Sequence, residues 1–426
     1  MKTNLFMALA FAFLMLFAAC TEEKIIYVEK ENDVELLPGE GILTISLSDI
    51  TTRAARPIDH FDPSTDLSSG GNNVNRIGFR IYQHGTTKKI EGVTVSSWNG
   101  SEVTTTTDLN QYILKVDKMS ASETYQLKLS GLTEGRYIII AYGYNATGDS
   151  DTPPYTISDI ENEIYLKATV NEGDKFHEEL FAGSEDVSVN QYGNFIQEYA
   201  ITLDRQVSGM LVYLEKIPAY VGNERVKSLT VSTYMDIFGI YFPASLYDKE
   251  FANGFGGTSY SEANLLTFTF DDDKISNASL QPGDRYEFNG GFLLPDEMDE
   301  DVVTYLKNSV TCLKNTLFGS CFLLPFANSG DYIHDEKTPL YIVLRGENEK
   351  TLKTINLKEL KEDGEQRYFI SRNHFYSLGT KINAKQDDDD DPLEIDADSG
   401  VEYLLLKIDD GWKENHNLIN GIEKGE

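Results

Sequence analysis

The chain has 426 residues, with 37 Lys and Arg against 69 Asp and Glu, so its formal net charge is −32. This balance argues against binding to nucleic acid or adsorption to anionic lipid, because both need clustered cations. Apolar residues make up 40% and aromatic residues 11%, enough for hydrophobic cores. We therefore expect two or three folded domains and exclude a fibrous or largely disordered chain.

The first twenty residues resemble a bacterial lipoprotein signal. Lys2 precedes a nearly uninterrupted apolar run, residues 5–19, which is too short to span a membrane comfortably. The run ends in Phe-Ala-Ala-Cys, which is similar to a lipobox with Phe17 in place of the usual Leu. We expect a signal peptide over residues 1–19, lipidation of Cys20 and a charged tether over residues 20–40. An ordinary cleaved signal peptide is the alternative.

From residue 41 onward, alternating apolar residues and turn residues predict strands almost throughout. In residues 41–48, Leu43, Ile45 and Leu47 share one face. A Ser-, Gly-, Asn- and Asp-rich loop follows this strand up to about residue 75. Further strands are predicted over residues 76–83, 90–97, 111–116, 125–129, 132–142, 164–168, 178–181 and 199–203.

A second series of predicted strands begins near residue 206. Its members cover residues 207–214, 226–234, 265–270, 286–294, 339–345, 352–357, 368–378 and 401–408. One helix is predicted after Pro295, because Val302, Val303, Leu306 and Val310 recur at helical spacing. Short strands at regular spacing favour an all-β chain of β-sandwiches with Greek-key type connections and little helix over βαβ units. We place the boundary between two sandwiches at residues 205 and 206.

Little in the sequence points to catalysis. Nucleotide-binding, metalloprotease and serine-hydrolase motifs are absent, and the six His are scattered, so we nominate no catalytic residue, metal site or cofactor. Cys312 and Cys321 could form one disulfide in an oxidising compartment or remain two buried thiols. The run of five Asp at 387–391 is expected to be a solvated loop, since its spacing is poor for calcium.

Three segments carry a family resemblance. They are residues 135–137 (GRY) before an apolar strand, residues 203–209 (LDRQVSG) followed by Ile217 and Pro218, and residues 368–378 (YFISRNHFYSL). The third is the most specific. Behind a lipoprotein signal and an N-terminal strand followed by Arg, this layout resembles the fimbrillin superfamily of type V pili over nearly all of residues 20–426.

The resemblance implies two tandem transthyretin-like β-sandwich domains, residues 41–205 and 206–426, that assemble by strand exchange. A trypsin-like protease would cut after the first strand, and its loss would expose a groove that a strand of another subunit fills. In this sequence the displaced strand is the one carrying Leu43, Ile45 and Leu47. The cut is expected at Arg53, with Arg56 as the alternative, because Pro57 obstructs cleavage after Arg56.

The implied function is that of a structural subunit of a fimbrium at the cell outer membrane, an accessory or tip subunit with an adhesion role and not an enzyme. A shaft subunit fits less well, because residues 401–408 read as a core strand and the tail is polar. The implied partners are other pilus subunits, the processing protease and, through the lipid on Cys20, the outer membrane. The alternatives are a glycan-binding surface lipoprotein of an uptake system and a pilus anchor that keeps its lipid.

Overall fold

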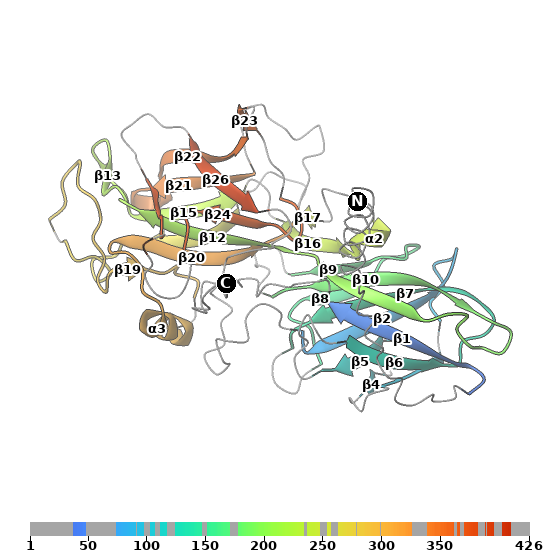
Figure 1. Cartoon of the computed structure of the whole chain (residues 1–426). Coiled ribbons are helices and arrows are strands. Elements are labelled where there is room, and N and C mark those ends of the chain that lie inside the picture. Colours follow the sequence, from blue (N-terminus) through green and yellow to red (C-terminus); the bar gives the residue numbers. More distant parts are fainter. Residues whose placement is uncertain are drawn as a thin grey trace, which may run out of the picture. The chain divides into compact units, whose positions relative to one another are not determined.

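The structure is a computed structural model of the chain (Figure 1). The residues that it describes are 37–47, 74–90, 92–97, 103–106, 111–116, 124–146, 151–170, 178–233, 237–247, 254–256, 263–277, 279–298, 300–325, 339–361, 364–366, 370–381, 388, 390–395 and 403–409. Cys20, Arg53 and Arg56 lie outside these residues, as do the predicted signal peptide, most of the tether and the C-terminal tail.

The described part of the chain is mostly β-structure, as the sequence predicts. Nine of its strands form one sheet: β1 (Glu40–Leu47), β2 (Arg76–Gln83), β3 (Thr94–Ser97), β4 (Val103–Thr106), β5 (Gln111–Lys115), β6 (Thr124–Ser130), β7 (Gly135–Tyr144), β10 (Phe181–Val189) and β11 (Tyr199–Arg205). Their order across the sheet is β3-β6-β1-β11-β10-β7-β2-β5-β4.

Strand β11 joins two halves of this sheet. Its first residues pair with β1, whereas Asp204 and Arg205 pair with β10. Side chains from both halves enter one buried cluster, to which β1 contributes Leu43, Ile45 and Leu47 while β2 and β7 contribute side chains from the other half. The two halves therefore face each other as the layers of a β-sandwich (Figure 1).

Strand β7 is buried on both faces, which explains its continuous apolar sequence. Tyr137 and Ile139 point into the sandwich core, whereas Ile140 and Tyr142 join a second buried cluster. That second cluster also takes Val207 and later residues, so side chains from before and after Gln206 pack together in it.

The strands after Gln206 form a larger sheet. Among the described residues it contains β12 (Ser208–Glu215), β15 (Ser228–Thr233), β18 (Ala263–Thr269), β19 (Phe292–Leu293), β20 (Thr316–Leu323), β21 (Leu340–Arg345), β22 (Thr351–Lys361), β23 (Gly364–Gln366), β24 (Phe375–Leu378), β25 (Leu393–Glu394) and β26 (Tyr403–Asp409). The main order is β18-β15-β21-β22-β26-β24-β12-β20-β19.

Smaller elements complete the described chain. They are a four-stranded sheet of β8 (Thr156–Asp159), β9 (Leu166–Thr169), β16 (Ile237–Phe242) and β17 (Gly254–Gly256), a pair of β13 (Tyr220–Val221) and β14 (Glu224–Arg225), two helices α2 (Ala244–Tyr247) and α3 (Glu300–Ser309), and a 3-10 turn (Glu347–Glu349). The four-stranded sheet takes β8 and β9 from before Gln206 and β16 and β17 from after it.

Most predicted strands are present, and the predicted helix is confirmed as α3. Several expectations need correction. Strand β10 begins at Phe181, where the predicted strand 178–181 ends. Within the predicted strand 286–294, only Phe292–Leu293 are in a strand. Tyr286 and Phe288, whose apolar character suggested a strand, instead stack on each other in a buried cluster. Among the described residues of the predicted strand 368–378, only Phe375–Leu378 are in a strand. Strands β4, β8, β16 and β20 were not predicted.

Candidate functional site

The N-terminal strand β1 lies in the interior of its sheet. It pairs antiparallel with β6, with Leu43 opposite Leu127, and parallel with β11, with Ile45 opposite Ile201. A strand in this position satisfies backbone N–H and C=O groups of both neighbours. Its removal would leave two facing sheet edges, which is an arrangement that readily accepts another strand.

The inward side chains of β1 fill the sandwich core. Leu43 and Ile45 are fully buried and Leu47 is 3% exposed, whereas the alternating Ile42, Thr44 and Ser46 are only partly buried. Burial of each such aliphatic side chain contributes about 1.5–3 kcal/mol. The three residues predicted from the sequence as the displaced strand are thus brought together on one face, over the core. We call β6, β11 and the core beneath β1 the β1 site.

Polar contacts fix the start of β1. Lys128 of β6 donates from Nζ to Glu40 Oε1 at 2.8 Å, and Gly131 N donates to Gly39 O at 3.3 Å. Asn194, in the turn between β10 and β11, donates from Nδ2 to the backbone oxygen of Glu40 at 2.9 Å. The contact between this turn and β1 was not predicted from the sequence. The residues around Gly193 indicate a turn, but they do not indicate which strand the turn contacts.

The predicted processing residues cannot be placed relative to β1. Arg53 and Arg56 fall in residues 48–73, the segment between the described end of β1 and Val74. Cys20 also lies outside the described residues. Processing and lipidation therefore stay predictions from the sequence.

Two of the three segments that carry the family resemblance meet in space, although 168 residues separate them. Arg205 Nη1 donates to Asn373 Oδ1 at 3.3 Å. Gly209 N donates to His374 O, Asn373 N donates to Val207 O, and Ser208 donates from its hydroxyl to Ser371 O. The segments are therefore joined by backbone and side-chain bonds at the start of β12.

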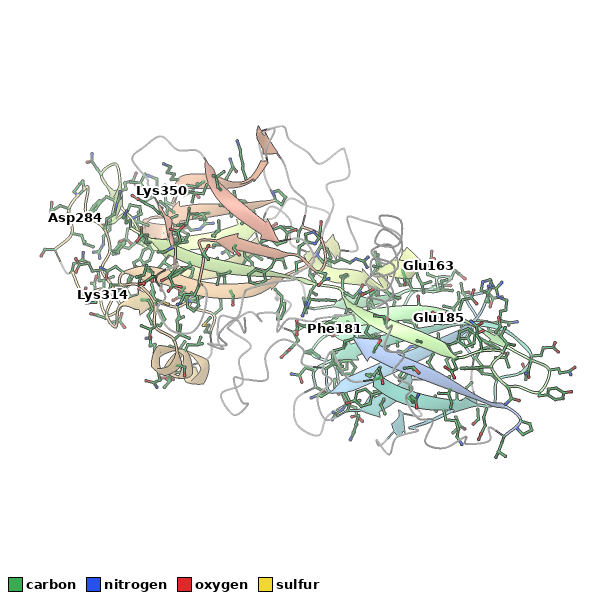
Figure 2. All side chains as sticks on the ribbon, in the orientation of Figure 1. Glu163, Phe181, Glu185, Asp284, Lys314 and Lys350 are labelled. Carbon is green, nitrogen blue, oxygen red and sulfur yellow. The ribbon has the colours of Figure 1, made fainter. Side chains whose placement is uncertain are left out.

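Arg205 also anchors the end of the first series of strands. Its Nε donates to Glu179 Oε1 at 2.8 Å, and each of the two side chains is only 1% exposed. Its guanidinium lies 5.1 Å from the ring centroid of Phe181, which Figure 2 labels. This cation–π contact and the ion pair hold a charged group in an otherwise apolar region. The arrangement is structural and has no reactive group.

Cys312 and Cys321 are both buried thiols, which is the alternative to the disulfide considered from the sequence. Cys321 points from β20 into the cluster containing Leu317, whereas Cys312 belongs to the cluster on the other face of that strand, with Phe318. A bond between side chains on opposite faces would require backbone rearrangement. Burial raises the pKa of Cys312 to about 12.

The acidic run at 387–391 is not wholly solvated, contrary to the expectation from its charge. Asp390 Oδ2 accepts a hydrogen bond from Lys381 Nζ at 2.7 Å, and both side chains are fully buried. The backbone groups of Thr380 and Asp391 pair beside them. One carboxylate of the run thus closes a loop against a lysine. Among the described residues, no group of His, Cys, Asp or Glu is arranged to hold a metal ion.

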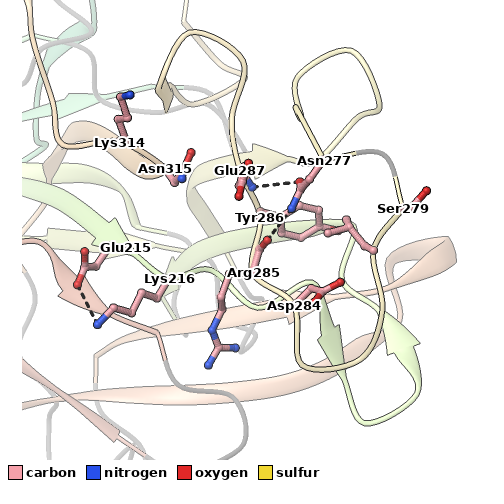
Figure 3. Close-up of a pocket in the computed structure, with 11 residues that line it drawn as sticks. Glu215, Lys216, Asn277, Ser279, Asp284, Arg285, Tyr286, Glu287, Lys314 and Asn315 are labelled. Carbon is pink, nitrogen blue, oxygen red and sulfur yellow. Dashed lines mark hydrogen bonds and ion pairs between the residues drawn. The ribbon is translucent and has the colours of Figure 1, made fainter.

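A pocket of about 420 Å³ lies at the end of β12 (Figure 3). Asn277 shapes it by donating to Arg285 O and accepting from Glu287 N. Its walls carry both charges, from Glu215, Lys216, Asp284, Arg285, Glu287 and Lys314. Tyr286 is 1% exposed, so its ring offers no stacking surface. The mixed charges and the buried ring favour no particular ligand class.

No sequence-family model matches the chain, and no curated protein matches it. Its structure matches a candidate adhesin from Bacteroides thetaiotaomicron at 10% identity, over 89% of this chain and 98% of that one, with a TM-score of 0.40. It matches a candidate cell adhesion protein from Parabacteroides distasonis at 10% identity, over 87% and 99%, with a TM-score of 0.36.

A further match is the fimbrial anchor protein Mfa2 from Porphyromonas gingivalis, at 9% identity over 80% of this chain and 90% of that one, with a TM-score of 0.33. These matches are to adhesion and fimbrial proteins. With TM-scores below 0.5 they supply no residue, partner or activity for this chain. Within the described residues, no helix is both long and apolar enough to cross a membrane.

Proposed function

We propose that this chain is a structural subunit of a cell-surface fimbrium, exported as a lipoprotein through Cys20 and assembled by strand exchange. The observation that carries the proposal is the position of β1, which is the first described strand and lies between β6 and β11. Proteolysis between β1 and β2 would leave β1 held by non-covalent contacts alone. A strand from another subunit could then replace both its backbone pairing and its buried side chains.

The proposal includes two tandem transthyretin-like β-sandwiches, divided at residues 205 and 206. In its support, the nine-stranded sheet uses only strands up to Arg205, and the larger sheet uses only strands from Ser208 onward. The buried Arg205–Glu179 pair and the bonds of Val207 and Gly209 to the 371–374 turn stabilise the connection between them.

The proposal also concerns the position of the subunit in the fimbrium. Strand β26 pairs with β22 on one side and with β24 on the other. A strand held on both edges is not available for donation to a neighbour. This supports an accessory or tip subunit with an adhesion role over a shaft subunit that donates its C-terminal strand.

The test is the N-terminal sequence and mass of the mature protein sheared from the cell surface. We expect a chain that starts at Ala54, without lipid, because Pro57 disfavours cleavage after Arg56. The variant Arg53→Ala should retain β1 and stay out of fimbriae, while the matched control Arg56→Ala should be processed and incorporated normally. Mature protein in intact fimbriae that still carries residues 41–53 would overturn assembly by strand removal.

The same measurement separates the alternatives. A chain that starts at a lipid-modified Cys20 would indicate either a membrane-held anchor or a glycan-binding lipoprotein. Capture of pilus subunits by the purified protein would then identify the anchor. Binding to a glycan panel, read as a rise in melting temperature, would identify the glycan-binding protein.

A further inference from the structure

The turn between β10 and β11, residues 190–196, is a rigid element at the start of the β1 site. Asn190 closes it by accepting from Tyr192 N at 2.9 Å and from Asn194 N at 3.1 Å through its side-chain oxygen. Val189 and Phe195 form a backbone bridge, and Ile196 N donates to Ser188 O. These bonds hold Asn194 and Phe195 in fixed positions.

Phe195 lies directly against Gly41, the first inward-facing residue of β1. A Cβ added to Gly41 would lie closer than 3.0 Å to three ring atoms, of which the nearest is Cγ. Since Cγ is the root of the ring, a small rotation of the ring tip would not relieve the clash. Phe195 is itself held edge-on to Tyr199, with ring centroids 5.4 Å apart. A larger residue at this point would have to displace the Phe195 side chain.

The residue before this glycine, Glu40, is held by an ion pair with Lys128. Glu40 is paired with Lys128 at 2.8 Å, and its backbone oxygen accepts from Asn194. Because side chains alternate across a strand, a shift by one residue would move the aliphatic face of β1 out of the core. It would also separate the Glu40 carboxylate from Lys128, whereas the bond from Asn194 goes to a backbone oxygen that any residue supplies. Glycine and the preceding acid thus mark the register of the strand.

The turn also carries exposed apolar side chains. Among the described residues, the exposed large apolar side chains are Leu37 at 63%, Tyr192 at 65%, Ile196 at 60% and Leu405 at 42%. Of these, Tyr192 and Ile196 belong to this turn. Exposed apolar side chains on one turn are typical of a surface that another chain contacts.

We propose that the β10–β11 turn selects the strand that enters the β1 site, with Phe195 as the specificity-determining residue. The partner is an extended segment of another subunit that reads acid, glycine, and then aliphatic residues at the second, fourth and sixth positions after the glycine. This inference rests on the proposed strand exchange. It adds the rule by which a correct strand, in the correct register, is distinguished from other apolar segments.

The first test is a double-mutant cycle in the full, uncut chain, and it does not depend on strand exchange. Gly41→Ala should lower Tm by about 3–10 °C, the shift expected from overpacking a core position. With Phe195→Ala already present, the same change should lower Tm by less than about 2 °C. Leu47→Ala, at the far end of β1, is the control and should lower Tm equally in both backgrounds. Equal effects of Gly41→Ala with and without Phe195 would overturn the inference.

The second test measures selection itself. A site-specific protease sequence replaces residues 51–56 of the full chain, and the chain is cut there and unfolded in urea. The released fragment that carries β1 is removed, and the remaining chain is refolded with two competing peptides of residues 38–48. One peptide has the natural sequence and the other carries Gly41→Ala. We expect the natural peptide to be incorporated about tenfold more than its competitor, and the Phe195→Ala protein to take both about equally.

The possible failures are distinct. Equal incorporation of both peptides by the natural protein would overturn selection by Phe195 while leaving strand exchange intact. Incorporation of neither peptide would overturn strand exchange. In that case the cycle in the uncut chain still decides whether Phe195 requires glycine at position 41.

Discussion

The Arg205–Glu179 ion pair is nearly inaccessible to solvent, and Asn373 and Phe181 surround its guanidinium. Breaking a buried pair by removing one charge usually costs about 3–5 kcal/mol, because the remaining charge stays buried. We therefore expect Glu179→Gln to lower the free energy of unfolding by that amount in urea titrations.

The matched control is Asp186→Asn, which removes a carboxylate from the exposed Arg136–Asp186 pair. Its effect should stay below about 1 kcal/mol. Equal losses for the two variants would show that burial of Arg205 contributes nothing to the cost.

The contact partners of single buried residues could not be predicted from the sequence. Asp390 belongs to an acidic run whose composition predicts solvation, yet it is buried because Lys381 is placed opposite it by the pairing of Thr380 with Asp391. The partner of Arg205 was equally hidden, since Glu179 is one of 69 acidic residues. A pattern along the chain indicates which face a residue occupies and not which residue it meets.

At the scale of elements, β1 combines a clear sequence pattern with a central position. Leu43→Ala and Ile45→Ala each remove a fully buried aliphatic side chain and should cost about 2–5 kcal/mol of unfolding free energy. Thr44→Ala, on the outer face of the same strand, is the matched control and should cost less than about 1 kcal/mol. Losses that do not follow the alternation would contradict the described register.

The short strand β8 supplies a pH-dependent contact. Asp159 Oδ2 lies 2.5 Å from Lys89 Nζ, and Tyr82 donates to Oδ1 at 2.9 Å. Burial alone would raise the pKa of Asp159, but the hydrogen bonds from Lys89 and Tyr82 and the charge of Arg80 lower it below its usual 3.8. A carboxylate whose pKa is lower in the folded state stabilises the fold above its unfolded pKa, and that contribution is lost as the pH falls through the folded pKa.

We therefore expect the natural chain to lose more unfolding free energy than Asp159→Asn between about pH 5 and about pH 3. Urea midpoints measured across this range give the comparison. Asp273→Asn, at an exposed position in a turn, should follow the natural chain. Parallel curves for the natural chain and Asp159→Asn would show that Asp159 does not contribute to acid stability.

The strands that the sequence predicted well have either a clear alternation or clear turn residues at both ends. Strand β1 alternates cleanly because only one of its faces is fully buried. Strand β2 is buried on both faces, yet it begins and ends as predicted. Strand β20 was missed although β12, which is also buried on both faces, was predicted, because Gly319 and Ser320 interrupt the apolar run of β20. Its strand conformation is explained by pairing with β12, the antiparallel partner that lies about a hundred residues earlier in the chain.

At the scale of the whole molecule, the candidate site depends on long-range pairing that no local pattern encodes. The sequence predicted that residues 41–48 form a strand with Leu43, Ile45 and Leu47 on one face. Its neighbours come from residues 124–130 and 199–205, and the turn at its start comes from residues 190–196. The displaced strand could therefore be predicted, whereas the surface that it leaves could not.

The central position of β1 in its sheet should keep it in place after a cut. If the chain is cut once in residues 48–73, β1 should remain bound, since both its edges are paired and three of its side chains are buried. Native size-exclusion chromatography should give a single monomeric species that denaturing gels resolve into two fragments. A cut in residues 326–338, between β20 and β21, is the control, because it frees no single strand.

Removal of the β1 fragment in urea should then change the assembly. On refolding, the edges of β6 and β11 and the apolar core beneath them lose their cover, so the remaining chain should form oligomers. Added peptide of residues 38–48 should restore the monomer. A folded, monomeric chain without β1 and without peptide would show that the β1 site closes on itself, and the physical basis for strand exchange would then be lost.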